Sequence, residues 1–377
     1  MTNCDYFNAM QCRSCAWLEQ DYGQQLANKQ AQSELALAAI YEQPPQWSPA
    51  QASAPVAMRN KAKMAVAGTL LQPSLGLAAL GHAPVDLSEC LLYSDELRSY
   101  FPLVKAFIGA AQIAPYDPQQ RRGELKFVLL TQPWPDSALM LRLVLRSKEA
   151  LDRIQKHLPT LLRQLPPDSV VSINLQPEHK AVLEGPSEIL LSDRRWLEVT
   201  FNHRQLLFGT QSFLQTNSTV AAALYARAAD WIDELDPNQA LDLYCGVGAF
   251  AFHAASGDRK VVGVEISAEA IAAADAAIAL NGDLRIEFRC GNAETALDDS
   301  NRNDLVIVNP PRRGLGAKLC HDLNRSGCPN LLYSSCNIDT LETDLRRLSN
   351  YRASKAQVFD MFPHTKHFEV LTLLEKY

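Results

Sequence analysis

From about residue 217 to the end of the chain, short apolar segments alternate with segments of helical pattern. The segments ALDLY, VVGVEI, LRIEFRC, DLVIVN and NLLYSS have the length and apolar content of buried strands. Helices are predicted between them, over residues 218–235, over residues 249–255 and after Ser267, which can cap an alanine-rich helix. This alternation favours a doubly wound, mostly parallel sheet that binds ligands at the carboxyl ends of its strands. We therefore predict an α/β domain over residues 211–377.

The end of the chain continues the pattern. Asp339 and Glu342 have the spacing of a capping box, which predicts a helix that extends to Leu348. The segments KAQVFDMF and FEVLTLLEK follow and are predicted to be the last two strands.

The first part of the chain, residues 1–210, has a different rhythm. A helix is predicted over residues 24–41, and a loop rich in proline and alanine follows it. The segments ELKFVLLTQ, ALMLRLVLRS, VVSINLQ, EILLSD and WLEVTFN are predicted strands, and residues 148–165 form a predicted helix among them. We expect an α+β region with a mostly antiparallel sheet.

The overall composition sets limits on the class of protein. The 377 residues are 47% hydrophobic and 21% charged, which is ordinary for a soluble globular chain. The chain has no apolar run long enough to span a membrane and no pattern of a signal peptide, so we expect a cytoplasmic protein. A net charge of −6 argues against a protein that coats nucleic acid non-specifically, although a local basic groove remains compatible with it.

A glycine-rich turn, DLYCGVG, lies at the end of one predicted strand, starts at Asp242 and opens a helix. Its glycines let the backbone approach a ligand closely. The third glycine of a dinucleotide fingerprint is missing, which weakens a reading as an NAD site. Glu265 ends the next strand, where a carboxylate can bind ribose hydroxyls. The pair is typical of an S-adenosylmethionine site, although any tight turn can carry two glycines.

A second motif, NPPRRG, follows a later predicted strand. Its two prolines stiffen the loop and would present Asn309 and backbone carbonyls to the ligand crevice. A rigid connector between strand and helix is the alternative. Arg312 and Arg313 are equally compatible with phosphate contacts and with ordinary surface charges.

A cysteine and a glutamate complete the candidate site. Cys336, in SSCN, follows a predicted strand and would lie in the same crevice, where a flanked thiol suits a reactive thiolate. Glu369, in HFE, begins the final strand and could take a proton there, although a solvated edge residue is the alternative. Four other cysteines are interpreted as buried spectators: Cys245, Cys290, Cys320 and Cys328.

These parts together fit one reaction, the methylation of carbon 5 of uracil. Carbon 5 is a poor nucleophile until a thiolate adds to carbon 6 of the ring. Carbon 5 can then take a methyl group, a base removes its proton, and the thiol is eliminated. An enzyme of this kind needs a cysteine, a base, a methyl donor and a base extruded from the stack.

The motifs DLYCGVG, VEIS, NPPRRG, SSCN and HFE, with FLQTN before the domain, resemble those of the RNA uracil-C5 methyltransferase family. The resemblance covers essentially the whole chain and implies a C-terminal Rossmann-like class I S-adenosylmethionine methyltransferase domain. It implies that Cys336 is the nucleophile and Glu369 the base. The implied S-adenosyl-L-methionine contacts are Gln215, Tyr244, Glu265 and Asn309. Many members carry Asp where Asn309 stands, and the Asn resembles the subgroup that acts on 23S ribosomal RNA.

The N-terminal cysteines form a separate candidate site. Cys4, Cys12 and Cys15 have the spacing C-x7-C-x2-C, and Cys90 is a distant fourth thiol. Thiolates favour zinc or an iron–sulfur cluster, and the spacing alone does not separate the two. The family resemblance implies a [4Fe–4S] cluster held by all four, with a structural or RNA-positioning role.

The sequence gives the least information about which residues bind RNA. The resemblance implies 23S ribosomal RNA as partner and no membrane, and a monomer is the plain expectation. We expect no additional RNA-binding domain before Cys4, and we therefore expect the central region to hold the substrate. The segment MRNKAK, at residues 58–63, and Arg121 with Arg122 are candidate phosphate contacts, which solvated charges explain about as well.

Several alternatives compete with this interpretation. The same chemistry could act on another ribosomal or transfer RNA uracil. An RNA methyltransferase for exocyclic amines would use the NPP loop but would leave Cys336 without a role. An iron–sulfur RNA-binding protein with an inactive methyltransferase domain, and an NAD-dependent redox enzyme, fit the motifs less well.

Overall fold

The structure is a computed structural model that describes residues 2–77, 84–135, 137–179, 182–297 and 303–377. These residues form two compact units. One unit, which we call the catalytic unit, contains residues 14–55 and 199–377. The other, which we call the central unit, contains residues 2–13 and 56–198. The catalytic unit therefore includes an N-terminal segment that the sequence analysis grouped with residues 1–210.

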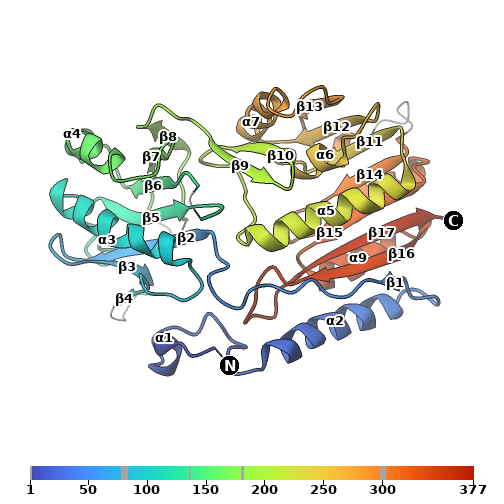
Figure 1. The fold of residues 1–377 in the computed structure, drawn as a ribbon, viewed down its shortest axis with the longest axis horizontal. Helices are drawn as coiled ribbons and strands as arrows, with labels where there is room; N and C mark the ends of the chain where they lie inside the picture. Colours follow the sequence, from blue (N-terminus) through green and yellow to red (C-terminus); the bar gives the residue numbers. More distant parts are fainter. Residues whose placement is uncertain (1, 78–83, 136, 180–181, 298–302) are drawn as a thin grey trace. The chain divides into compact units, whose positions relative to one another are not determined.

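The catalytic unit is built on an eight-stranded sheet (Figure 1). In sheet order its strands are β1 (Gln46–Trp47), β16 (Tyr351–Phe359), β17 (Glu369–Lys376), β15 (Asn330–Ser335), β14 (Leu305–Val308), β11 (Gln239–Leu243), β12 (Lys260–Glu265) and β13 (Ile286–Cys290). Strands β15, β14, β11, β12 and β13 are parallel. The predicted mostly parallel α/β sheet is confirmed, and β17 adds an antiparallel strand between β15 and β16.

Helices cover this sheet because the connections between parallel strands must cross its faces. They are α2 (Tyr22–Ala38), α5 (Ser218–Leu235), α6 (Ala249–Ala254), α7 (Ala268–Ile278), α8 (Gly316–Arg325) and α9 (Ile338–Arg347), with a short 3-10 turn at Ala293–Thr295. Helix α5 contacts α6 and β17, whereas α8 packs on α9 and α9 on α2. Leu37 of α2 joins one buried apolar cluster with Leu341 of α9 and Val370 of β17.

The N-terminal ends of three helices can be compared directly with the predicted helix starts. The side chain of Asn217 accepts a hydrogen bond from the backbone of α5, and Ser267 caps α7 as predicted. The predicted capping box at Asp339 is wrong. Asn337 caps α9 instead, since its side chain accepts the Asp339 backbone N–H at 3.2 Å. Asp339 therefore lies inside the first turn, where a carboxylate favours the helix dipole.

The central unit contains a seven-stranded sheet in the order β4 (Val85–Asp86), β3 (Pro73–Leu77), β2 (Lys61–Gly68), β5 (Leu125–Thr131), β6 (Met140–Leu145), β7 (Val170–Leu175) and β8 (Ser187–Leu190). All neighbouring pairs are antiparallel except β6 with β7, so the prediction of a mostly antiparallel sheet is confirmed. Strands β9 (Leu197–Phe201) and β10 (Arg204–Phe208) form a separate two-stranded sheet.

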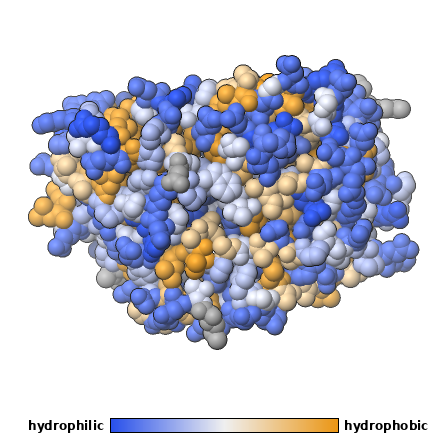
Figure 2. Space-filling model, in the orientation of Figure 1, coloured by the Kyte–Doolittle hydropathy of each residue, from blue (hydrophilic) through white to orange (hydrophobic). Residues whose placement is uncertain are grey.

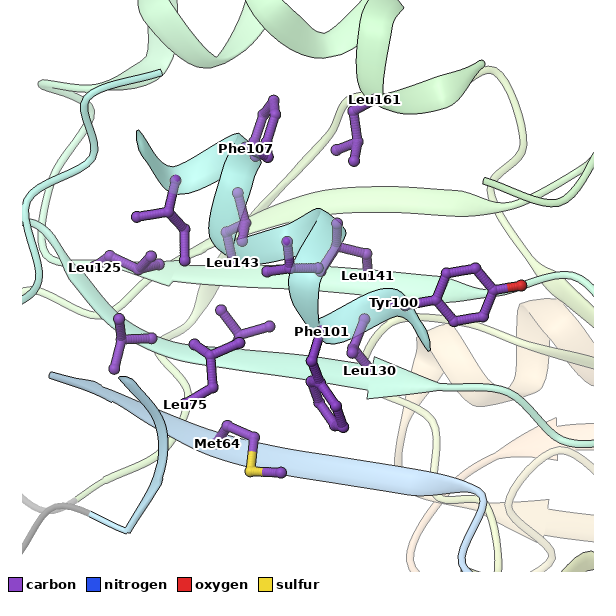
Figure 3. Packing of buried hydrophobic residues seen from close by; sticks show 14 of the residues in the cluster. Met64, Leu75, Tyr100, Phe101, Phe107, Leu125, Leu130, Leu141, Leu143 and Leu161 are labelled. Carbon is purple, nitrogen blue, oxygen red and sulfur yellow. The ribbon is translucent and has the colours of Figure 1, made fainter. Parts of the chain in front are cut away.

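Helices α3 (Asp95–Ala110) and α4 (Leu151–Leu162) pack apolar side chains against the central sheet. The short helix α1 (Asp5–Asn8) also belongs to this unit. Figure 3 shows Phe101 of α3 near Met64 and Leu130 of the sheet, and Phe107 on the side of Leu161 of α4. Helix α4 was predicted from the sequence, whereas α3 was not. Pro102 lies inside α3, as the eighth of its sixteen residues, where a proline leaves one helical hydrogen bond unmade.

On the face shown in Figure 2, hydrophilic residues predominate and apolar residues form small groups. Within the part of the chain that the structure describes, none of the helices is both long and apolar enough to cross a bilayer.

Candidate active site

The antiparallel pairing of β15 with β17 places the two candidate catalytic residues. Ser334 lies opposite Leu371, and Ser335 lies opposite Val370. One further step in this register brings the backbone of Cys336 to the position opposite Glu369. Because side chains alternate between the two faces of a strand, Ser334 and Glu369 are diagonal neighbours on one face. The hydroxyl of Ser334 accordingly donates a hydrogen bond to the Glu369 carboxylate at 2.5 Å.

Glu369 is a buried carboxyl group, with only 1% of its surface exposed. Burial raises its pKa to about 7, and the hydrogen bond from Ser334 opposes part of that rise. The charge of Glu369 in turn helps to raise the pKa of the buried Tyr225 phenol on α5, after burial itself. The alternative of a solvated edge residue is thus wrong for Glu369. A carboxyl group with a pKa near neutrality can accept a proton at physiological pH.

The thiol of Cys336 is half-buried and is not activated in the free protein. Burial raises its pKa, the charge of Glu369 raises it further, and Arg312 lowers it. A thiol with a raised pKa is mostly protonated at neutral pH. A reactive thiolate at Cys336, as expected from the sequence, would require transfer of the thiol proton to a base.

The NPPRRG loop lies directly beside Cys336. The backbone carbonyl of Arg312 accepts hydrogen bonds from Asn337 Nδ2 at 3.1 Å and from Thr340 Oγ1 at 3.2 Å. The guanidinium of Arg312 donates to Nδ1 of His367 at 3.0 Å, which requires that nitrogen to be unprotonated. Burial lowers the pKa of His367, and the charge of Arg312 lowers it further.

Gly314 explains the last position of this motif. Its φ is +78°, and a Cβ atom there would lie 2.3 Å from Oδ2 of the buried Asp344. That same oxygen accepts hydrogen bonds from the Leu315 backbone at 2.6 Å and from the Tyr333 hydroxyl at 2.9 Å. The loop after β14 is therefore fastened to α9 and β15.

Cys336 opens into a pocket of about 220 Å³ within the catalytic unit. The residues that line it come from the NPPRRG loop, the start of α9, the segment before Glu369 and one position of α2: Gln32, Arg312, Cys336, Asn337, Ile338, Asp339, Lys366, His367 and Phe368. Arg312 and Lys366 give the pocket two positive charges. The involvement of α2 was not predicted from the sequence.

The glycine-rich turn has the geometry expected of a ligand-binding loop. Gly246 and Gly248 have φ values of +57° and +83°, a region that favours glycine. Glu265 ends β12 and accepts hydrogen bonds from the backbone N–H groups of Gly246 at 3.3 Å and Ser267 at 2.9 Å. These contacts fix the Glu265 carboxylate at the carboxyl edge of the sheet, where cofactor ribose groups bind in this architecture.

The other predicted cofactor contacts lie in the catalytic unit. Tyr244 has a positive φ of 62°, and its half-buried phenol has a pKa raised chiefly by burial. Asn309 is half-buried directly after β14, and Gln215 is buried just before α5. None of these three side chains, nor Glu265, lines the pocket of Cys336.

Asp242 is a buried group whose role the sequence analysis did not specify. Its carboxyl group is fully buried and accepts a hydrogen bond from the Ala251 backbone at 3.0 Å. Burial raises its pKa to about 8, and the charge of Glu265 contributes to the rise. Its place at the end of β11, in the DLYCGVG motif, was the available signal.

Three of the four N-terminal cysteines belong to the central unit. Burial raises the pKa of the Cys90 thiol, and the charges of Cys4 and Cys12 raise it further. Cys15 belongs to the catalytic unit. Within the described ranges, no group of three or more His, Cys, Asp or Glu side chains is arranged to hold a metal ion. Among the cysteines interpreted as buried spectators, Cys245, Cys320 and Cys328 are buried as predicted. Cys290 is exposed, so the prediction of burial is wrong for that residue.

Comparisons with known proteins decide the family. Residues 192–377 match the model of the tRNA (Uracil-5-)-methyltransferase family. The 23S rRNA (uracil(747)-C(5))-methyltransferase RlmC of Pectobacterium atrosepticum is 46% identical over 99% of this chain and 100% of its own length. The enzyme of the same name from Edwardsiella ictaluri is 45% identical over 99% of this chain and 98% of its own. The chain belongs to the RNA uracil-C5 methyltransferase family.

A solved structure supports the fold of this family member. The tRNA (uracil-54, C5)-methyltransferase of Pyrococcus abyssi, in complex with S-adenosyl-L-homocysteine, superimposes with a TM-score of 0.80 at 24% sequence identity. The match covers 96% of this chain and 85% of that one. The chain therefore has the α/β fold of S-adenosylmethionine-dependent methyltransferases, and the glycine-rich turn with Glu265 fits such a cofactor.

Proposed function

We propose that this enzyme methylates carbon 5 of one uracil in 23S ribosomal RNA, the uracil that corresponds to position 747 in the names of its relatives. The support is twofold. Full-length relatives with that name are 46% and 45% identical. Within the molecule, the observation that carries the chemistry is the buried Glu369, which is placed in register with Cys336 and has a pKa of about 7.

The chain's own residues divide the work as follows. Cys336 adds through sulfur to carbon 6 of the uracil, and its proton passes to a base. Bound S-adenosylmethionine supplies an electrophilic methyl group. Carbon 5 would take that methyl group as the methyl–sulfur bond breaks and S-adenosylhomocysteine is released. Glu369 would then remove the proton from carbon 5, and the electron pair of that bond would restore the double bond as the Cys336 thiolate leaves. Arg312 stabilises the thiolate by its charge.

Four residues are proposed to hold the cofactor. Glu265 would bind the ribose hydroxyls, as strand-end carboxylates do in this architecture. Gln215, Tyr244 and Asn309 complete the proposed set, because each belongs to a motif of the family. Asn309 is neutral, so it would act there as a hydrogen-bonding group only.

The test of this function is covalent trapping. RNA that carries 5-fluorouracil at the target should form a stable adduct with the protein, because fluorine at carbon 5 cannot leave as a proton does. The Cys336→Ala variant should form none, and its turnover should fall by about a thousandfold or more. Cys290→Ala, which removes an exposed thiol elsewhere, is the matched control and should behave as the wild type. A methylating Cys336→Ala variant would favour an amine methyltransferase instead.

We also propose that Cys4, Cys12, Cys15 and Cys90 together bind a [4Fe–4S] cluster. The support is the thiol pattern and the influence of Cys4 and Cys12 on the pKa of Cys90. The methyl transfer moves no electron, so the cluster would be structural or would position RNA. Anaerobically purified protein should contain iron and acid-labile sulfide, and Cys90→Ser should lose both. Zinc without sulfide would overturn the cluster.

The remaining proposals concern the cellular location, the oligomeric state, the domain boundaries and the residues that bind RNA. We propose a cytoplasmic enzyme that acts as a monomer, with an RNA-binding region over residues 1–210 and a methyltransferase domain over residues 211–377. The basic residues of MRNKAK in the central unit are candidates for phosphate contacts, for which the expected signature is weaker binding at higher salt.

A further inference from the structure

Helix α2 is held in the catalytic unit by buried polar side chains. Nζ of Lys29 donates to Oδ1 of Asp360 at 2.6 Å, and both side chains are fully buried. The same Nζ donates to the carbonyl of Phe362 at 3.1 Å. One helical turn earlier, Oε1 of Gln25 accepts the backbone N–H of His364 at 2.8 Å. The helix therefore fastens the segment that leads from β16 to β17.

This attachment brings one further side chain of α2 to the reaction pocket. Gln32 lies three residues after Lys29, so the two occupy neighbouring positions on the helix surface. Lys29 binds the start of the 360–368 segment, and Gln32 lines the pocket together with Lys366 and His367 from the end of that segment. Gln32 is thus the residue by which the N-terminal segment lines the pocket of Cys336.

The side chains of the pocket indicate that Gln32 is suited to hydrogen-bond the polar edge of uracil. Uracil presents an N–H donor and carbonyl acceptors on its polar edge, and a primary amide can match both at once. The other amide in the pocket is already engaged, because Asn337 donates to Arg312 and accepts from Asp339. Among the described side chains that line the pocket, Gln32 is the primary amide with no hydrogen bond inside the protein.

The charged groups of the pocket suit other parts of the substrate. Arg312 and Lys366 carry positive charge and match phosphate groups. Asp339 can accept a hydrogen bond but cannot donate one to a uracil carbonyl when it is ionised. A neutral group that both donates and accepts is complementary to the pyrimidine edge.

We propose that Gln32 is a specificity-determining residue that pairs with the polar edge of the target uracil when the ring lies against Cys336. The proposal rests on the proposed function, in that Cys336 must be the nucleophile. Lys29 and Asp360 act as positioning residues, since they hold α2 at the pocket.

The experiment compares Gln32→Ala and Gln32→Glu with the wild type and with Gln24→Ala. Gln24 is an exposed glutamine on the same helix that bonds to Asn28 and lies outside the pocket, so its variant is the matched control. Three quantities are measured: the rate of adduct formation with 5-fluorouracil-containing RNA, the affinity for that RNA as a function of salt, and the thermal midpoint.

Gln32→Ala should slow adduct formation by about tenfold to a hundredfold, as expected for a lost bidentate contact to a base. RNA affinity, its salt dependence and the thermal midpoint should match those of Gln24→Ala. Gln32→Glu should be at least as slow as Gln32→Ala, although its shape is nearly unchanged, because a carboxylate cannot donate to a carbonyl oxygen.

Two outcomes would overturn the proposal. Adduct formation in Gln32→Ala at the rate of Gln24→Ala would remove Gln32 from the site. Weaker RNA binding with an unchanged rate of adduct formation at saturating RNA would make it a backbone contact instead. A wild-type protein that forms no adduct contradicts the proposed function itself, so the two failures are distinguishable.

Discussion

Asp360 and Glu369 stand at the two ends of one connecting segment, and both carboxyl groups are buried, with 0% and 1% of their surfaces exposed. Their surroundings differ. Asp360 accepts hydrogen bonds from the Lys29 ammonium and from the Tyr22 hydroxyl at 2.8 Å. Glu369 accepts one from the neutral hydroxyl of Ser334. A buried charge paired with an opposite charge holds structure together, whereas a buried carboxyl group without such a partner keeps a pKa suited to proton transfer.

The largest expected difference between the two is in turnover. Glu369→Gln should reduce methylation by about a hundredfold to ten-thousandfold, because the proton on carbon 5 loses its acceptor. Unmodified RNA should then accumulate as a methylated adduct on Cys336, visible as a band shift on a denaturing gel. Glu375→Gln, on the same strand, is the control and should turn over normally. Turnover of Glu369→Gln within threefold of the wild type would assign the base elsewhere.

The second difference is in stability. Lys29→Met leaves Asp360 buried without its counter-charge and should lower the free energy of unfolding by about 3–5 kcal/mol. Replacing both partners, as Lys29→Met with Asp360→Asn, should recover much of that loss, because no uncompensated charge remains. Denaturant unfolding of the two variants measures both quantities. A loss below about 1 kcal/mol in the single variant would show that water reaches the pair.

The smallest effect concerns pH. The pKa of Glu369 is raised in the folded state, to about 7 from an ordinary value of 4.5. Its contribution to stability is therefore fully present below pH 4.5 and is lost as pH rises through 7. Between pH 5 and pH 8, Glu369→Gln should gain up to about 3 kcal/mol of unfolding free energy relative to the wild type. An equal difference between the two proteins at both pH values would contradict the raised pKa.

Much of the catalytic unit could be predicted because its information is local. Alternating apolar segments predicted β11 to β15, and strand-end motifs predicted where Cys336, Glu265 and Glu369 would lie. The antiparallel insertion of β17 was not predictable, because KAQVFDMF and FEVLTLLEK look alike whether they pair in parallel or antiparallel. The capping of α9 by Asn337 was missed because Asp339 offered an equally good capping motif two residues later.

The role of α2 depends on a contact between residues 331 positions apart, which no local pattern contains. One signal was nevertheless present. Gln25, Lys29, Ser33 and Leu37 occur at every fourth residue, and these four are the buried residues of α2. A helix with polar residues along its inner face must find partners for them in another part of the chain. Gln32 could not be recognised without that packing, because its own neighbours in sequence are ordinary.

The pairing of Lys29 with Asp360 also bears on how the protein is made. Synthesis runs from the amino end, so α2 leaves the ribosome long before the segment that contains Asp360 and Glu369 exists. Until then Lys29 has no acidic partner. Gln32 also lacks the residues of the 360–368 segment with which it forms the pocket. A chain that ends before residue 360 lacks Asp360, Lys366, His367 and Phe368, so the pocket beside Cys336 cannot form until the last strands have been synthesised.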